Sequence, residues 1–516
     1  MKKSNSVDDT KLDEADEKQV FRVEGSEYGA GGVRDGELSA GDGVFARMQR
    51  YVGGFGVEKR GIERVPDTIE ERTDTSMSKI GTVWMSSNMA VACFGIGTIA
   101  QPVFGLGFVD SVLTIFFFNI LGVLPTSFFA TFGPIFGLRQ LALSRFFFGW
   151  YGVKLYAFFT VLTCLGWSTL QIVLGAQLFH AINPNMPGWA GILVIAFITI
   201  LVGGFGYKVV HEYQRWSWIP NFIIYLIVLG QFARSGQFDS LLPLESGHAE
   251  AGRILSFGST VFSAATGLCS YASDYTVYQP SSSRRTTVFF WSFGGLLLPL
   301  LFVEMLGCAI GTATVRVESF AQAWGDAGVG GLLGNVLIPP LGDFGRFCLV
   351  VLALGTISNN CPNVYSVSFG IQVLSRRSAH VPRLIWTLLG VCVAVAVGIP
   401  AYDNFAPWLE TFLVTTAYWL AIYEAIALTE HFVFRRGIKG YNPEDYNTPS
   451  KLPAGFAAFG AFAFGVAGCV LGMTREWWTG PIGTLSGGDL GFELAFGFSV
   501  VSYAVLRAVE RSRFKR

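Results

Sequence analysis

Charge is scarce in this chain, and so are the residues that most catalytic sites need. Only 14% of its 516 residues are Asp, Glu, Lys or Arg, whereas a globular domain typically carries about 25%. The formal net charge is zero, and no basic run is interleaved with aromatic residues, so we predict no nucleic-acid partner. The five histidines lie near the ends of apolar segments, without an HExxH or GxSxG motif. These absences argue against a metalloenzyme or a serine hydrolase.

The sequence also has no CxxC motif, and no cleavable signal peptide is visible in it. The eight cysteines lie inside apolar segments without CxxC spacing, which favours a role as small packing residues. The first 45 residues are polar and contain no apolar core of a signal peptide. We expect 1–60 to be a disordered cytoplasmic tail, because it has too few apolar residues to fold alone. The mixed-charge stretch 61–80 is expected to be an ordered juxtamembrane segment.

Long apolar runs dominate the rest of the chain. Its composition, with 46 Phe and 62 Gly and a mean hydropathy of +0.46, suits helices packed closely in lipid. Runs of about 20 apolar residues are long enough to span a bilayer. Twelve spans are predicted, at 81–103, 109–132, 155–182, 189–207, 216–233, 255–273, 288–312, 344–373, 383–400, 405–430, 453–473 and 487–509. Lys and Arg gather in alternate loops, so both termini are predicted to be cytoplasmic.

Spans one and six contain glycine and polar residues where a lipid-facing helix would be aliphatic. Span one reads WMSSNMAVACFGIG and span six reads STVFSAATGLCSYASDY. They begin two predicted five-helix repeats, 81–233 and 255–430, which are followed by two accessory helices at 453–509 and a cytoplasmic tail at 510–516. Five is an odd number, so the two repeats would insert with opposite topology. Interrupted helices at corresponding positions indicate a transporter with a midplane site, although glycine-rich helices also serve close packing.

Span eight carries the densest group of polar side chains, in the stretch GTISNNCPNVYS. Thr356, Asn359, Asn360 and Asn363 have the spacing of one helix face. An asparagine amide offers a donor and an acceptor side by side, as in its bidentate pairing with adenine. Hydrogen bonds between helices are the alternative role. Three Asn on one stripe favour a ligand site.

Span three supplies an aromatic ring and an amide on one side of a helix. Trp167 and Gln171 are four residues apart, so a planar heterocycle could stack on the indole while an amide binds its edge. The alternative is a buried Trp with Gln171 and Gln177 bonded to neighbouring helices. Ser86 and Ser87, followed by Asn88, are expected at a comparable depth in span one.

Four carboxylates are candidates for coupling transport to a cation. A charge inside a bilayer costs at least about 2.5–3.5 kcal/mol, so intramembrane acids are functional candidates, and burial favours a neutral carboxyl group that can carry a proton. The candidates are Glu304, Glu424, Glu410 and Asp274. For each, a permanently neutral acid or an ion pair near a helix end is the alternative.

Sodium would need different ligands. These would be backbone carbonyls from a broken span one and hydroxyls such as those of Thr356 and Ser358. Glu430 and His431 are expected to form a solvated helix end before Arg435. The glycine-rich stretch 325–334 is expected in an outer loop; no strand precedes it, so it is not read as a dinucleotide site.

Several patches together resemble a known family. They are GIERVP with ERTD, W-x-S-x-N-M in span one, SRFFFGWYGVKLYAFFTVLTCLGW, ATGLCSYASDYTVYQP, NNCPNVYS, and YWLAIYEAIALTEHFVFRRG with a following YN. In this order, over about 61–450, they resemble the fungal purine-cytosine permease branch of the nucleobase cation symporter family. The resemblance implies an all-α, twelve-helix LeuT-type fold with a 5+5 inverted repeat plus two helices. It also implies nucleobase import driven by a cation, usually a proton.

The resemblance also implies which residues contact the substrate. Trp167 would stack on the base, Asn359 and Asn360 would bind its edge, and Ser87 or Ser86 would contribute from span one. Three positions depart from the family. Gln171 stands where Asn is usual, Leu268 stands where Trp is usual, and Cys361 replaces an apolar residue. The longer amide and the missing second ring leave another aromatic heterocycle, such as a vitamin B6 compound, as the alternative substrate.

The expected function is therefore secondary active import rather than catalysis. A channel would require repeated rings of charges or carbonyls, and a sensor on the same fold is a further alternative. The expected partners are a small heterocycle and the lipid bilayer, most simply the plasma membrane. No cofactor is expected beyond a symported H⁺, or Na⁺ in the alternative. The sequence does not indicate an oligomeric state.

Overall fold

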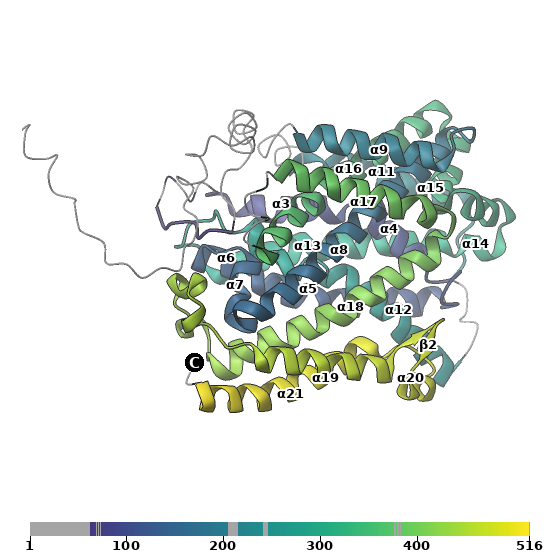
Figure 1. Ribbon diagram of the computed structural model, residues 1–516. Coiled ribbons are helices and arrows are strands. Elements are labelled where there is room, and N and C mark those ends of the chain that lie inside the picture. Colours follow the sequence, from purple (N-terminus) through teal and green to yellow (C-terminus); the bar gives the residue numbers. More distant parts are fainter. Residues whose placement is uncertain are drawn as a thin grey trace, which may run out of the picture. The chain divides into compact units, whose positions relative to one another are not determined.

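The computed structural model describes residues 62–68, 70, 72, 74–204, 215–240, 246–375, 378, 381 and 383–514. These residues belong to one unit of packed helices, with a single short hairpin among them (Figure 1). The expected disordered tail at 1–60 lies outside the described residues. The segment from Ile62 to Ser76 is ordered without regular secondary structure wherever it is described.

The first half of the chain is helical, and the first repeat predicted there remains a prediction. Its helices are α3 (Met77–Asn88), α4 (Val91–Thr98), α5 (Phe108–Ala130), α6 (Phe132–Phe136), α7 (Gln140–Leu143), α8 (Arg145–Ile182), α9 (Gly188–Gly204) and α11 (Trp218–Ser235). Helix α8 begins ten residues earlier than the predicted span at 155–182. The reason is a bend at Gly149 (φ 74°), where glycine alone is unstrained, which joins a buried first turn to the membrane helix.

Span one is broken, as its composition predicts. Helices α3 and α4 meet at an angle of 51°, and Ala90 between them has extended backbone (φ −129°, ψ 155°). The side chains of Ser87 and Asn88 donate to the carbonyls of Val83 and Trp84 in the preceding turn. Such bonds compete with the backbone ladder and bend helices, so the SSN sequence itself helps to end α3.

The second half repeats the arrangement. Its elements are α12 (His248–Thr266), η1 (Cys269–Tyr275), α13 (Arg285–Gly311), α14 (Ala313–Arg316), α15 (Glu318–Leu341), α16 (Asp343–Leu374), α17 (Arg383–Asp403) and α18 (Phe405–Thr429). Span six changes after Thr266 from an α-helix to the 3₁₀ helix η1, a tighter coil that often marks a hinge. The stretch 325–334 lies in α15 and not in the predicted loop; α15 bends there at Gly328 (φ 52°).

The two repeats exchange partners symmetrically. Helix α3 packs on α13 of the second repeat, and its counterpart α12 packs on α5 of the first. Glycines permit the closest approaches: a Cβ on Gly97 would lie 1.9 Å from the Glu304 carbonyl oxygen, and one on Gly122 would lie 2.9 Å from that of Phe262. This exchange is what an inverted repeat requires, because each broken helix must pack between both halves.

The accessory region follows α18. It comprises η3 (Glu430–Phe434), η4 (Ile438–Gly440), η5 (Pro443–Asn447), η6 (Pro449–Lys451), α19 (Phe456–Gly472), β1 (Thr474–Arg475), β2 (Trp478–Thr479), α20 (Pro481–Ser486) and α21 (Gly491–Phe514). Helices α19 and α21 lie side by side along α18 (Figure 1). The predicted tail at 510–516 is helical as far as Phe514.

The protein is an integral membrane protein, and each predicted span overlaps a helix. Within the described residues, seven helices are long and apolar enough to cross a membrane singly, and the bent pair α3 and α4 raises the total to eight. Helices α9 and α19 are apolar but shorter. The number of twelve spans and the orientation of the termini remain predictions.

Candidate substrate site

Helices α8 and α16 form the frame of the site, and two contacts set their register. A Cβ on Gly175 of α8 would lie 3.0 Å from the Thr356 hydroxyl of α16, and one on Gly370 of α16 would lie 2.4 Å from the Val161 side chain of α8. The helices are therefore antiparallel along this stretch. At an equal rise per residue, this register brings Gln171 level with Asn360.

Gln171 and Asn360 are fully buried amides that have no hydrogen-bond partner among the described residues. Each is 0% exposed, and in each both side-chain polar atoms lack a partner. The role of Gln171 as a bonded link between helices is therefore wrong. Because an unpaired buried polar group costs about 1–3 kcal/mol and nearly all such groups are satisfied in proteins, two at one level indicate a place where a polar ligand completes the bonding.

Trp167 lies one turn from Gln171 and is 8% exposed. Its Nε1 has no partner, and its ring makes an edge contact with Phe412 of α18 at a centroid distance of 5.7 Å. The break in span six faces the same indole, since a Cβ on Gly267 would lie 3.2 Å from Nε1. Leu268, the next residue, is partly buried against the core. Trp167, Gln171, Asn360 and Leu268 thus occupy three elements around one region.

The other residues predicted to contact the substrate, Asn359, Ser86 and Ser87, form hydrogen bonds within the protein. Asn359 is partly exposed, and its backbone carbonyl accepts from the Asn363 amide at 3.2 Å. The Ser86 hydroxyl accepts from the Trp218 backbone N–H at 3.2 Å, which ties α3 to α11, and Ser87 donates to its own helix. The structure therefore gives the two serines hydrogen bonds within the protein, and their contact with substrate remains a prediction.

Asn221 of α11, which the sequence reasoning missed, occupies the break in span one. Its side-chain nitrogen donates to the carbonyl of Met89 at 2.9 Å, and it is 3% exposed. Thr356 donates to the Ala353 carbonyl, and Ser358 bonds Ser217 at 3.0 Å. The Met89 carbonyl and these hydroxyls therefore form hydrogen bonds within the protein, and each oxygen keeps a lone pair that could bind a cation. The sequence feature that could have identified Asn221 is a single amide in an apolar span.

Glu304 is a buried acid on α13. It is 0% exposed, one oxygen accepts from the Asn119 amide of α5 at 2.7 Å, and the other has no partner. Asn119 lies in the run FFFNILG of span two, where an isolated amide could have been noticed.

Glu424 is buried in α18 at 2% exposure. It accepts a short hydrogen bond from the Thr266 hydroxyl, and the Cys269 thiol lies near it. Both neighbours come from span six. Glu304 and Glu424 therefore remain candidates for carrying a cation or proton.

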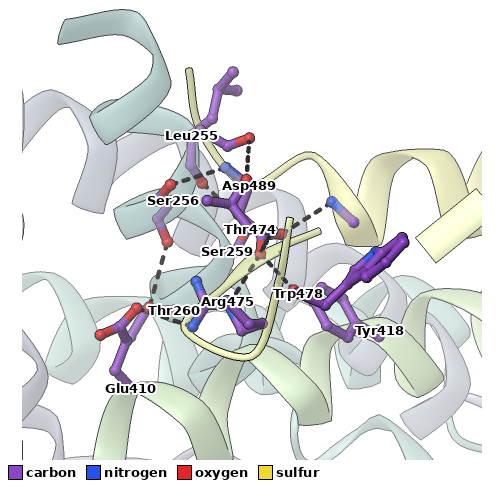
Figure 2. Close-up of polar contacts among 12 residues, drawn as sticks. Leu255, Ser256, Ser259, Thr260, Glu410, Tyr418, Thr474, Arg475, Trp478 and Asp489 are labelled. Atoms are coloured by element: carbon purple, nitrogen blue, oxygen red, sulfur yellow. Dashed lines mark hydrogen bonds and ion pairs between the residues drawn. The ribbon is translucent and has the colours of Figure 1, made fainter. Parts of the chain in front are cut away.

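Glu410 belongs to an ion-pair network instead. Arg475 of β1 donates to Glu410 at 2.9 Å, and Asp489, which is 0% exposed, accepts from the Tyr418 hydroxyl at 2.5 Å. The backbone N–H of Asp489 donates to Ser256 of α12 at 2.9 Å, so Asp489, just before α21, links α12 to α18 (Figure 2). For Glu410 the alternative of an ion pair near a helix end is what the structure shows.

Asp274 has a structural bond. One oxygen accepts from the backbone N–H of Gln140, the first residue of α7, at 2.7 Å. The Gln140 side chain in turn donates to the Tyr423 hydroxyl at 3.0 Å. Asp274 therefore fixes the loop between spans two and three against the end of span six.

The solvated helix end predicted at Glu430 and His431 is wrong. Glu430 is 1% and His431 is 2% exposed. Arg507 of α21 and Arg435 pair with Glu430 at 3.0 and 3.1 Å, and Tyr503 donates to it. The accessory helix covers this end, which the pattern of α18 alone does not reveal.

No metal cluster appears in the part of the chain that the structure describes: no group of three or more His, Cys, Asp or Glu is placed to hold an ion. The cysteines described there are unpaired, and all but Cys392 are buried, in agreement with a packing role.

Comparisons with known proteins agree with this architecture. The family model described as a permease for cytosine/purines, uracil, thiamine and allantoin matches residues 65–496. The purine-cytosine permease fcyB of Emericella nidulans is 50% identical and is aligned over 94% of this chain and 95% of its own. The vitamin B6 transporter TPN1 of Saccharomyces cerevisiae is 27% identical over 91% and 90%.

The fold has a solved counterpart. The nucleobase-cation-symport-1 family transporter Mhp1, in a closed conformation with bromovinylhydantoin, superposes with a TM-score of 0.64 at 16% identity, covering 87% of this chain and 96% of that one. The helical LeuT-type fold is thus confirmed. From the family match and the extended identity to fcyB, the chain belongs to the purine-cytosine permease branch of this transporter family and is not an enzyme.

Proposed function

We propose that this protein imports a nucleobase, a purine or cytosine, across the plasma membrane by proton symport. The observation that carries the proposal is the pair of fully buried, unpartnered amides of Gln171 and Asn360 at one level of α8 and α16. Each amide offers a donor beside an acceptor. A nucleobase edge presents the complementary pattern.

Trp167 provides the stacking surface in this proposal. A base lying against the indole would place its edge toward the amides, because Gln171 follows Trp167 by one helical turn on the same face. Stacking of bases on aromatic side chains is worth about 1–3 kcal/mol per base. Phe412 supports the ring from its edge, which fixes the orientation of the platform.

Proton coupling is supported by two acids that lie inside the helix bundle. Glu304 and Glu424 are buried acids that no Arg or Lys pairs with among the described residues. A neutral, protonated form of such a group avoids the cost of a buried charge.

A second substrate class is supported by Leu268. A leucine in the break of span six gives the site an aliphatic wall, and Gln171 extends its amide by one methylene beyond an asparagine. Both changes suit a heterocycle that differs in size from cytosine, such as a vitamin B6 compound. One relative of this chain, TPN1, is named a vitamin B6 transporter. A nutrient sensor on the same fold would bind the ligand without accumulating it.

Uptake of radiolabelled adenine, cytosine, hypoxanthine and pyridoxine tests the proposal in yeast cells that lack their own permeases, at pH 5 and pH 7.5. We expect saturable base uptake that is stronger at pH 5 and abolished by a protonophore. Uptake of pyridoxine alone would replace the substrate. Uptake that ignores the protonophore but requires sodium would replace the ion, and binding without uptake would favour a sensor.

A further inference from the structure

Glu424 bridges the two parts of the broken span six. Thr266, which donates to its carboxylate, is the last residue of α12, and Cys269, whose thiol lies near the same carboxylate, is the first residue of η1. Only Gly267 and Leu268 lie between them. A single buried carboxyl group on α18 therefore bonds one end of the two-residue break and lies near the other.

The same break forms a wall of the proposed base site. Gly267 lies against the Trp167 indole, where a Cβ would come within 3.2 Å of Nε1, and Leu268 packs with the cluster around Cys164 and Val367 of α8 and α16. A change in how Glu424 holds Thr266 must move the backbone that contacts the stacking ring, because protein interiors are close-packed. The carboxyl group and the site are thus connected through one residue.

The groups that face Glu424 are neutral. From η1 the titratable group is the Cys269 thiol, from its own helix it is the Tyr423 phenol, and α12 presents the Thr266 hydroxyl. Among the described residues, no Arg, Lys or His is paired with it. With no cation to balance a carboxylate in the membrane, its charge depends on whether a proton is bound.

Glu304 is placed less favourably for coupling. Its titratable neighbours are Cys93 on α4 and Cys308 on its own helix. Its hydrogen-bond partner Asn119 belongs to α5, which continues without a break through this level. The carbonyl of Glu304 lies against Gly97, about two turns beyond the break in span one.

We propose that Glu424 binds the symported proton and that its protonation sets the geometry of the span-six break against Trp167. This inference rests on the proposed function, because it names the residue that couples the base to the proton. A proton taken up by the carboxylate gives a neutral acid that can donate as well as accept. Its release on the other side leaves an anion that draws the Thr266 hydroxyl closer, and with it the start of the break.

The test uses the purified full chain in proteoliposomes with the base that the wild type accumulates under an inside-alkaline pH gradient. Glu424→Gln should still exchange labelled for unlabelled base at equal pH within about threefold of the wild-type rate, since it keeps the shape of the acid and the bond to Thr266. It should lose accumulation, so that internal and external base become equal. The matched variant Glu304→Gln should still accumulate base when the gradient is imposed.

Gradient-driven accumulation by Glu424→Gln at the wild-type level would overturn the proposal, as would its loss in Glu304→Gln alone. If Glu424→Gln does not fold, Thr266→Val keeps the acid and removes its donor. We then expect a shifted pH profile of uptake in Thr266→Val and an unchanged one in Thr160→Val, whose buried hydroxyl bonds only its own helix. Identical profiles in both variants would refute the coupling role.

A measurement without base separates this inference from the proposed function. Acidification should change the part of the intrinsic tryptophan fluorescence that comes from Trp167, which is identified by its loss in Trp167→Phe. Glu424→Gln should remove this response to acid. If the wild type accumulates no base yet shows the response, the substrate is wrong and the proton site stands. If it accumulates base by proton symport and shows the same response in Glu424→Gln, the transport function stands and the role of Glu424 fails.

Discussion

Asn360 and Gln171 show how burial converts an ordinary residue into a candidate for recognition. An amide at a surface bonds water, and an amide between helices usually bonds a neighbour, but these two do neither. Asn363, one turn further along α16, is also buried, yet its amide bonds the Asn359 carbonyl. Neighbouring asparagines on one stripe therefore have different roles.

Replacing Asn360 with Ala should weaken base uptake far more than replacing Asn363. Losing a bidentate contact to a base costs about 1–3 kcal/mol, which is on the order of 10- to 100-fold in apparent affinity. Asn359→Ala should also impair uptake, but less, because that residue is partly exposed. Concentration-dependent uptake at matched surface expression measures these effects. Equal apparent affinities for Asn360→Ala and Asn363→Ala would exclude the amide contact.

Trp167 should act as a flat platform. Trp167→Phe keeps a ring and should retain most of the affinity, whereas Trp167→Ala should lose about 1–3 kcal/mol of binding. Competition between labelled and unlabelled base gives both values. An equal loss in the two variants would show that the indole matters through packing or its N–H and not through stacking.

At the scale of elements, glycines permit the closest approaches between helix backbones. The broken helices α4 and α12 lie against α13 and α5 with backbone atoms in contact, and side chains beyond hydrogen are excluded at those points. The breaks expose the residues of the site, while the glycines allow the broken pieces to pack between the repeats. Both features come from the same glycine-rich segments.

Gly97→Ala should prevent α4 from packing on α13. Its Cβ would lie 1.9 Å from the Glu304 carbonyl oxygen, a backbone atom that has no room to move. We expect the variant to be retained inside the cell and degraded. Gly294→Ala in α13 meets nothing within 4 Å and should reach the surface normally. Fluorescence microscopy of tagged proteins measures delivery to the surface. Normal surface delivery of Gly97→Ala would contradict the close packing of α4 on α13.

At the scale of the whole molecule, polar clusters fasten segments that are far apart in the sequence. Arg72, 3% exposed, donates to the carbonyls of Pro134, Val277 and Gln279. Burial lowers the pKa of its guanidinium, and the ion pair with Asp67 opposes that shift. The juxtamembrane segment is thereby bound to the loops after spans two and six. Glu430 and Arg507 join α18 to the accessory helix α21 in a similar way.

Removing Arg507 should destabilise the fold. Arg507 is 3% exposed and pairs with both Glu430 and Glu510. Without it Glu430 keeps Arg435, but the buried Glu510 loses this cation, and an uncompensated buried charge costs up to about 3–5 kcal/mol. Arg507→Met should therefore lower the melting temperature of the detergent-purified protein by several degrees, whereas Arg513→Met, at an exposed position, should not. Unchanged melting of Arg507→Met would show that the pair contributes little.

The amino-acid sequence by itself determined the class of protein, the helical character of the predicted spans, the breaks in spans one and six, and the polar stripe in span eight. It did not show that 325–334 lies in a helix. These depend on local properties: apolar length, helix period, and the tendency of Ser, Asn and Gly to interrupt a membrane helix. The resemblance to the family also came from short local patches in a fixed order.

Only the tertiary structure decided what each buried group bonds. It set the register that brings Gln171 level with Asn360. It also paired Glu410 with Arg475 and buried Glu430 under α21. It also brought Glu424 to Thr266, 158 positions earlier in the chain. Such contacts depend on the packing of helices from different parts of the chain, and a local pattern does not encode which neighbour a polar side chain will meet.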